Sequence, residues 1–165
     1  MLKKFATIAG AAATLFTMVG ASTVAYAESP AVQADPVGTA ATCYGNSCSG
    51  KDPNATGCSA GAQVLADMVV LGFSAKEYLV RLSYSALCNA SWTDIQAINQ
   101  PDCYGGEYIW HQALNNSTGG VTSTARVYDG DACSTYTVMM SRVGRSTRAC
   151  STSTWTGRNH CTPWK

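Results

Sequence analysis

Eight cysteines carry the chemistry that is easiest to anticipate in this 165-residue chain. They are Cys43, Cys48, Cys58, Cys88, Cys103, Cys133, Cys150 and Cys161. Zinc sites use repeated, closely spaced cysteine pairs, and only Cys43 and Cys48 lie that close together, so the spacing favours structural disulfides over a metal site. An even number leaves no thiol over for a nucleophile, and the order of the cysteines does not choose among the pairings.

The two histidines, His111 and His160, and the ten carboxylates are the other groups that could transfer protons. A hydrolytic triad joins a nucleophile, a histidine and an orienting acid, but the chain has no G-x-S-x-G elbow that would present a serine. A small hydrolase that uses His111 or a carboxylate pair stays an alternative. The sequence favours packing or surface roles for these residues, so we predict no catalytic residue and no cofactor.

Three aspartates stand in turn sequences. Asp52 precedes Pro53 and is predicted to cap a turn. Asp129 and Asp131 flank Gly130 and are of the residue type that binds calcium, but an isolated pair lacks the further oxygen ligands of a calcium loop. We therefore predict no metal ligand.

Tryptophans and arginines in the C-terminal part offer a binding surface instead. Residues 28–115 carry a net charge of −5, whereas residues 116–165 carry +4. Exposed aromatic rings can stack on sugars, and guanidinium groups bind anionic ligands. The candidate ligand-facing residues are Trp155, Trp164, Arg142, Arg145 and Arg148. Docking of two oppositely charged halves, or plain solvation, explains the same charge pattern, and a total charge near zero speaks against nucleic acid as a partner.

The first 27 residues have the pattern of a secretory signal. Lys3 and Lys4 precede an uncharged apolar stretch, residues 5–24, and Ala25-Tyr26-Ala27 is a small-x-small cleavage site. An uncleaved membrane anchor is the alternative, because the apolar stretch is nearly long enough to span. The pattern predicts a secreted, extracellular protein without stable membrane insertion after cleavage. Its parts are a signal peptide (1–27), a flexible arm (28–42) and one disulfide-rich domain (43–165).

The 138 residues after the cleavage site are poor in large aliphatic side chains, since Val, Leu, Ile and Phe together number 20. Such a composition would indicate disorder at high net charge, but the net charge of these residues is −1. Small secreted domains with a thin core typically rely on disulfides, each of which contributes about 2–4 kcal/mol. We expect the stability of this domain to depend on its bridges.

Short strands separated by glycine and asparagine turns predict a small all-β domain. The clearest strand is 78–85, where apolar and polar residues alternate, and Trp92 is expected in the core beside Cys88. Further elements are expected at 61–70 (strand or short helix), 92–95, 107–114, 121–127 and 135–140, with a hairpin at 150–161. The predicted fold class is all-β, with or without a short helix, as a disulfide-stapled β-sandwich or barrel-like domain.

Two blocks of the sequence resemble a family of small exported bacterial domains, the YjfA-like domains of unknown function 2690. The first block is CYGNSCSGKDPNATGC at 43–58, and the second is the LSYS-x2-C-x3-W-x2-I pattern at 82–95. Weaker likenesses are YTVMM at 136–140 and the residues around Cys150 and Cys161. The resemblance implies an extracytoplasmic setting and favours a strand at 61–70, but the family supplies no activity to carry over.

Departures from the family pattern affect both charge and pairing. Arg81 and Ser83 stand where the family strand usually has an acidic and a basic residue, so a charged ligand contact there is not carried over.

Cys103 and Cys133 lie in the stretch that resembles the family least, which suggests an extra bridge between them. The same reasoning pairs Cys150 with Cys161. Two bridges remain among Cys43, Cys48, Cys58 and Cys88, and their pairing stays open.

The function that these observations favour is a secreted, non-catalytic binding module whose partner is an extracellular protein or a cell-wall polymer. A small secreted hydrolase and a secreted inhibitor or toxin-like antagonist are the alternatives.

Overall fold

The computed structural model describes residues 40–98, 106–130 and 132–165, except the side chain of Phe73. The predicted signal peptide (1–27) and nearly all of the predicted arm (28–42) lie outside the described residues, as do Cys103 and Asp131. Within the described part of the chain, no helix is long and apolar enough to cross a membrane.

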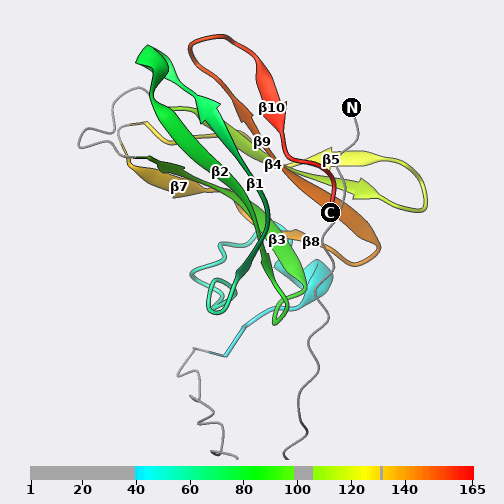
Figure 1. Ribbon diagram of the computed structural model, residues 1–165. Helices are drawn as coiled ribbons and strands as arrows, with labels where there is room; N and C mark the ends of the chain where they lie inside the picture. The colour runs from blue at the N-terminus through cyan, green and yellow to red at the C-terminus, as the bar shows by residue number, and fades with distance from the viewer. Residues whose placement is uncertain (1–39, 99–105, 131) are drawn as a thin grey trace, which may run out of the picture. The chain divides into compact units, whose positions relative to one another are not determined.

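Two antiparallel sheets pack face to face (Figure 1), so the described residues form a β-sandwich and not a closed barrel. Sheet A has the order β1-β2-β3-β7, with β8 also paired to β3, and sheet B has the order β10-β9-β4-β5, with β6 also paired to β4. The strands of sheet A are β1 (Gln63–Leu71), β2 (Glu77–Ser85), β3 (Ala90–Ala97), β7 (Ser134–Tyr136) and β8 (Met140–Ser141). The strands of sheet B are β4 (Tyr108–Asn115), β5 (Val121–Ser123), β6 (Val127–Tyr128), β9 (Arg145–Thr152) and β10 (Asn159–Cys161). The described helical elements are two 3-10 turns, η1 (Gly45–Cys48) and η2 (Phe73–Ala75).

An apolar core lies between the two sheets and follows from the alternation along β2. Tyr78, Val80 and Leu82 are fully buried, because every second side chain of a strand points to the same face. They pack with Ile95 of β3 and with residues of sheet B, including Ile109. The alternation predicted from the sequence therefore builds the interface between the sheets.

Next to this core the space between the sheets is filled by polar side chains. Ser91 and Thr93 of β3 approach His111 of β4, and the Ser91 hydroxyl donates a hydrogen bond to Thr147 Oγ1 of β9 over 3.1 Å. The hydroxyls and the imidazole ring supply donors and acceptors to one another, which offsets the cost of burying them. The low aliphatic content of the chain is thus accommodated by a hydrogen-bonded layer.

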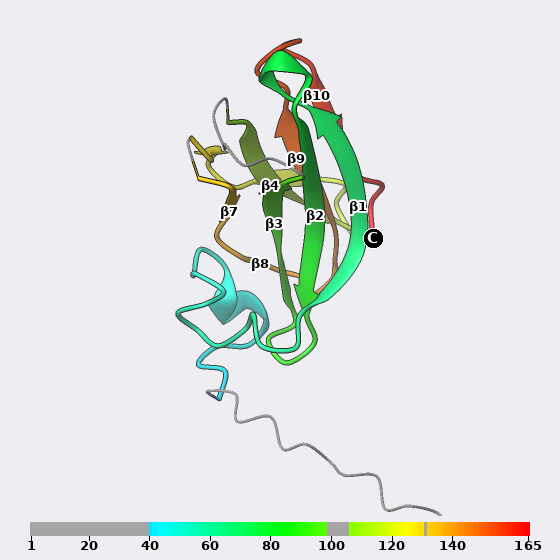
Figure 2. The same cartoon turned by 60° about the vertical axis from the view of Figure 1, so that its left-hand side comes forward.

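A second, smaller core lies on the outer side of sheet A, beneath residues 43–60, here called the Cys loop (Figure 2). Trp92 points to this side, because its neighbours Ser91 and Thr93 face sheet B. Trp92 packs there with Met139 and four buried cysteines. The prediction that Trp92 is a core residue beside Cys88 is confirmed.

Three disulfides join described residues: Cys43–Cys48, Cys58–Cys88 and Cys150–Cys161. The last bridge connects residues that are directly opposite each other in the β9–β10 hairpin. The first two lie beneath the Cys loop, and they give the pairing that the sequence left open. The predicted bridge between Cys103 and Cys133 involves a residue outside the described part of the chain and stays a prediction.

Most predicted strands are present, but two are interrupted. The expected strand 121–127 is the pair β5 and β6, and the expected strand 135–140 is the pair β7 and β8. In the second case the Thr137 hydroxyl accepts the hydrogen bond of Thr93 N in place of a backbone carbonyl. The chain then pairs with the Cys loop, since Met139 N donates to Lys51 O and Met139 O accepts from Gly50 N. The expected strand is interrupted because the chain at Met139 forms hydrogen bonds with the Cys loop instead of with β3.

Candidate functional site

His111, the candidate general base, is completely buried between the sheets. Its Nε2 lies 3.0 Å from Ser91 Oγ, and its Nδ1 lies 3.2 Å from Thr93 Oγ1. Burial, together with the nearby charge of Arg142, lowers the pKa of the ring to about 3. A neutral imidazole held between two hydroxyls inside the sandwich is a packing element, and it has no contact with solvent through which to meet a substrate.

A pair of buried carboxylates, Glu107 and Asp129, lies at the start of β4. Glu107 accepts hydrogen bonds from Thr154 N (2.8 Å) and Thr154 Oγ1 (3.1 Å), and Asp129 Oδ1 accepts one from Glu107 N (2.6 Å). Burial raises the pKa of Glu107 to about 7 and that of Asp129 to about 6. A Cβ atom on Gly72 would lie 2.4 Å from Glu107 Oε1, so backbone covers this carboxylate. The pair ties the β9–β10 connection to the residues just before β4 and just after β6.

The outer face of sheet B has a row of aromatic and planar polar side chains. Odd-numbered residues of β4 face sheet A, so the even-numbered ones point outward. Tyr108 is stacked at 4.9 Å between ring centroids with Tyr128, and both rings are exposed. Trp110, which is only 6% exposed, and the half-buried Gln112 follow along the same strand. The row therefore runs from a tyrosine pair at one end of β4 towards an amide at its middle.

Two arginines lie against the tryptophans of this face. The guanidinium carbon of Arg126 is 4.5 Å from the centroid of the Trp110 ring, and that of Arg148 is 4.2 Å from the Trp164 ring. Arg148 Nε also donates to Gln112 Oε1 over 2.8 Å, which fixes the plane of its guanidinium group. We call the side chains on this surface the sheet B face: Tyr108, Trp110, Gln112, Arg126, Tyr128, Arg148 and Trp164.

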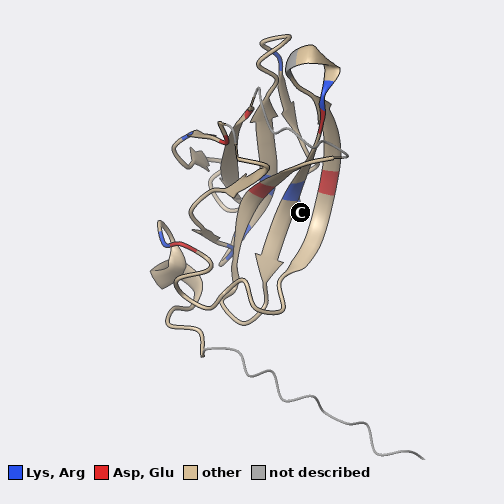
Figure 3. Cartoon of the chain, turned by 90° about the vertical axis from the view of Figure 1, so that its left-hand side faces the viewer, with Lys and Arg blue, Asp and Glu red and all other residues tan. Residues whose placement is uncertain are grey.

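The two sheets carry different charges. The described strands of sheet B contain no acidic residue. Sheet A instead has Asp67, Arg81 and Asp94 in register across β1, β2 and β3, and Figure 3 shows the resulting red, blue and red positions on neighbouring strands. Arg81 Nε donates to Asp94 Oδ1 over 2.5 Å. Arg81 on sheet A is thus paired with a carboxylate, whereas Arg126 and Arg148 beside sheet B lie against tryptophan rings.

A family model described as a protein of unknown function (DUF2690) matches residues 46–150. The chain belongs to the DUF2690 family. The match covers all but the first three residues of the Cys loop, all of sheet A and sheet B as far as Cys150, so it includes the resembling blocks at 43–58 and 82–95 almost completely. No curated protein and no solved structure matches the chain.

The five predicted ligand-facing residues of this DUF2690 member fall in different places. Trp164 and Arg148 lie together on the sheet B face. Trp155 is exposed in the connection between β9 and β10. Arg142 lies 4.9 Å from the centroid of the Tyr84 ring of sheet A, and Arg145 is the first residue of β9, opposite Asn115. The regular spacing of the three arginines does not bring them to one surface.

The other members of the sheet B face in this DUF2690 domain were not identified from the sequence. Tyr108, Trp110 and Gln112 lie in the predicted strand 107–114. Period-two spacing within that strand is the signal that places these three side chains on one face. Arg126 and Tyr128 have no comparable signal, because they come from the interrupted strand 121–127.

Proposed function

We propose that this member of the DUF2690 family is an exported, non-catalytic module that binds an anionic cell-wall polymer on the sheet B face. The observation that carries the proposal is the combination of stacked aromatic rings and arginines on a sheet whose described strands contain no acid. Aromatic faces suit the apolar side of sugar rings, and a guanidinium group binds phosphate or carboxylate through two parallel hydrogen bonds.

Charge complementarity favours a polymer of this type over a neutral glycan. Arg126 is exposed, and its guanidinium carbon lies over the Trp110 ring. Stacking uses the π-face of this group and leaves the N–H edge for an anion. Arg148 is oriented in advance by Gln112, so little side-chain entropy is lost when a ligand binds.

Export is supported by the disulfides and by the sequence of the first 27 residues. Disulfides persist in oxidising compartments outside the cytoplasm, and three of them join described residues. The small-x-small site after an apolar stretch is the pattern of a cleaved signal.

Sedimentation of the protein with purified bacterial cell walls tests this function, using walls before and after extraction of their anionic polymers. We expect binding to the untreated walls, weakening with added salt as surface electrostatics are screened. Trp164→Ala and Arg148→Ala should each weaken binding about 10-fold, as central tryptophan and arginine contacts commonly do.

The matched control is Trp155→Ala, since Trp155 is an exposed tryptophan outside the sheet B face. It should bind like the unmodified protein. Equal loss of binding in Trp155→Ala and Trp164→Ala would place the ligand elsewhere. Binding that survives extraction of the anionic polymers would contradict the proposed ligand class, and the absence of any sedimentation with walls would contradict the function itself.

A further inference from the structure

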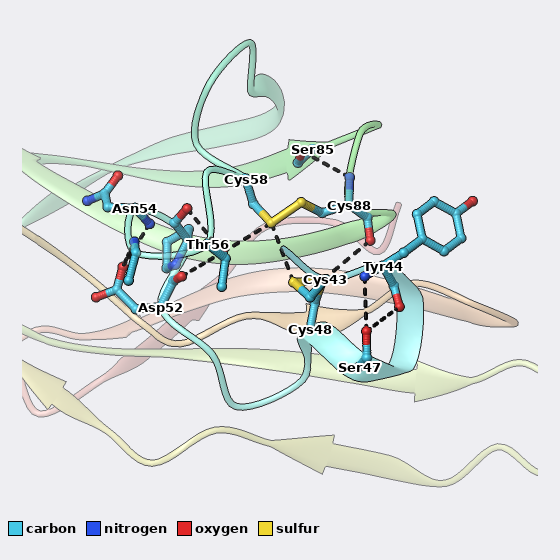
Figure 4. Close-up of a disulfide and its surroundings, with 12 residues drawn as sticks. Cys43, Tyr44, Ser47, Cys48, Asp52, Asn54, Thr56, Cys58, Ser85 and Cys88 are labelled. Carbon is cyan, nitrogen blue, oxygen red and sulfur yellow. Dashed lines mark hydrogen bonds between the residues drawn. A yellow bond between two sulfur atoms is a disulfide. The ribbon is translucent and has the colours of Figure 1, made fainter. Parts of the chain in front are cut away.

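Four cysteine sulfur atoms converge beneath the Cys loop, although they belong to two separate disulfides. The Sγ atoms of Cys43, Cys48, Cys58 and Cys88 all lie within 4.8 Å of one another. Cys43 Sγ is 3.7 Å from Cys58 Sγ, which belongs to the other bridge, and Figure 4 shows the two bridges side by side. Two disulfides that only attach a loop to a sheet need no contact between the sulfur atoms of different bridges.

This arrangement has the dimensions of a four-thiolate metal site. Zinc–sulfur bonds are about 2.3 Å long, so the sulfurs of a tetrahedral site lie about 3.8 Å apart. The contact between Cys43 and Cys58 already has nearly this length. The bonded sulfurs would have to separate, and the sulfurs that are up to 4.8 Å apart would have to approach by about 1 Å. The four donors come from η1 and the residues just before it, from the end of the Cys loop and from the turn between β2 and β3.

The surroundings of the sulfurs also suit bound metal. Cys43 is 8% exposed and the other three cysteines are fully buried, against a shell that contains Trp92 and Met139. Thr56 Oγ1 donates a hydrogen bond to Cys58 Sγ over 3.2 Å. Hydrogen bonds of this kind orient the ligands of metal sites, and an apolar shell limits the access of water.

We propose that Cys43, Cys48, Cys58 and Cys88 have a second, reduced state in which they bind one soft divalent cation such as Zn²⁺. Two equivalents of a dithiol reduce the two disulfides to four thiols and are themselves oxidised to two cyclic disulfides. Zn²⁺ then replaces the four thiol protons, which pass to the solvent. Oxidation of the four thiolates by a disulfide donor re-forms the two bridges and releases the cation. The metal-bound state belongs to the chain before its bridges form, in a reducing compartment.

Zinc titration of the reduced full chain tests the proposal. The chain is reduced with dithiothreitol, freed of reductant without oxygen, and titrated with Zn²⁺ against a chromophoric chelator. We expect one tightly bound Zn²⁺ per chain. Thr56→Val should weaken zinc binding about 10-fold without removing the site, because an outer hydrogen bond is lost while the ligands remain.

Two cysteine variants separate this site from the other thiols of the chain. Cys88→Ser should lose the tight site, whereas the double variant Cys150→Ser/Cys161→Ser should keep it. Equal zinc binding by Cys88→Ser and the unmodified chain overturns the proposal, as does loss of the tight site in the double variant alone.

Circular dichroism covers the case in which the reduced chain unfolds. Zn²⁺ should then restore the β-sheet signal of the unmodified chain but not that of Cys88→Ser. A reduced chain that neither binds Zn²⁺ nor regains structure with it also overturns the proposal. The sheet B face takes no part in these measurements, so their result is independent of cell-wall binding.

Discussion

Trp92 on the outer side of sheet A and Trp164 on the outer side of sheet B show how differently the two sheets use their outer faces. Trp92 is 5% exposed, because the Cys loop and its two bridges cover it. Trp164 is half-buried and lies against Arg148. One tryptophan completes a core, and the other forms part of an accessible surface.

The charged residues differ in the same way. Arg81 of sheet A is paired with Asp94, which also accepts a hydrogen bond from Ser83, so its charge is compensated within the sheet. Arg126 and Arg148 of sheet B stack on tryptophans. The comparison teaches that, of the two outer faces, that of sheet A is covered by a second core, whereas Arg148 and Trp164 beside sheet B stay partly exposed.

Replacement of the two tryptophans tests this division most directly. Trp92→Ala should lower the free energy of unfolding by about 3–5 kcal/mol, because it leaves a cavity between the Cys loop and β3. Trp164→Ala should lower it by less than about 1 kcal/mol. Urea denaturation followed by circular dichroism measures both values. Similar losses for the two variants would show that the outer faces do not differ as described.

Removal of single bridges sharpens the comparison within the Cys loop. The chain-entropy model gives about 4 kcal/mol for Cys58–Cys88, which spans 30 residues, and about 2 kcal/mol for Cys43–Cys48, which spans five. The double variants Cys58→Ser/Cys88→Ser and Cys43→Ser/Cys48→Ser should therefore differ in the urea concentration at the midpoint of unfolding. The reverse order would mean that contacts of the Cys loop outweigh loop closure.

The buried carboxylate of Glu107, which accepts hydrogen bonds from Thr154, has a smaller effect, which depends on pH. The pKa of Glu107 is about 7 in the folded protein, raised by burial from its ordinary 4.5. The folded state therefore binds the proton more tightly than the unfolded chain, so this group lowers the free energy of unfolding as pH rises from 4.5 towards 7. The loss is about 3 kcal/mol, and Glu107→Gln should abolish it.

The free energy of unfolding of Glu107→Gln has to be subtracted from that of the unmodified protein at each pH. His111, whose pKa burial lowers to about 3, acts in the opposite direction, since stability is gained as pH rises from there to its ordinary 6.5. Subtracting the two unfolding curves removes this contribution. A difference that does not change between pH 4.5 and 8 would contradict the raised pKa of Glu107.

The strands could be predicted where one face is apolar, and less well where contacts are polar. The alternation of Tyr78, Val80 and Leu82 was sufficient to place β2, and the cysteines at 150 and 161 marked the terminal hairpin. Asp52 caps its turn as predicted, since Oδ1 accepts from Asn54 N and Ala55 N. The predicted all-β sandwich is therefore confirmed, and the structure decides against the barrel-like alternative.

The convergence of the Cys loop on sheet A could not be predicted. It depends on Met139, which lies between β7 and β8 and forms its backbone hydrogen bonds with Gly50 and Lys51 instead of with β3. These residues are almost ninety positions apart, and no local sequence pattern indicates a contact between them. The buried role of His111 was equally hidden, because its hydroxyl partners Ser91 and Thr93 are read as surface residues by composition. Of the sheet B face, Arg126 and Tyr128 could not be predicted because β6 is too short to show periodicity, whereas the period-two spacing of Tyr108, Trp110 and Gln112 on β4 would have placed them together.

The outermost strand of sheet A bears on the behaviour of the protein at high concentration. The nine-residue strand β1 pairs with β2 and stands at the end of the strand order, with a bulge between Val64 and Ala66 and the exposed Asp67 at its middle. Edge strands invite pairing with further chains, and a bulge or a charge opposes it. Antiparallel addition of a second β1 centred on Asp67 would bring two carboxylates face to face, so this residue acts as a gatekeeper against aggregation.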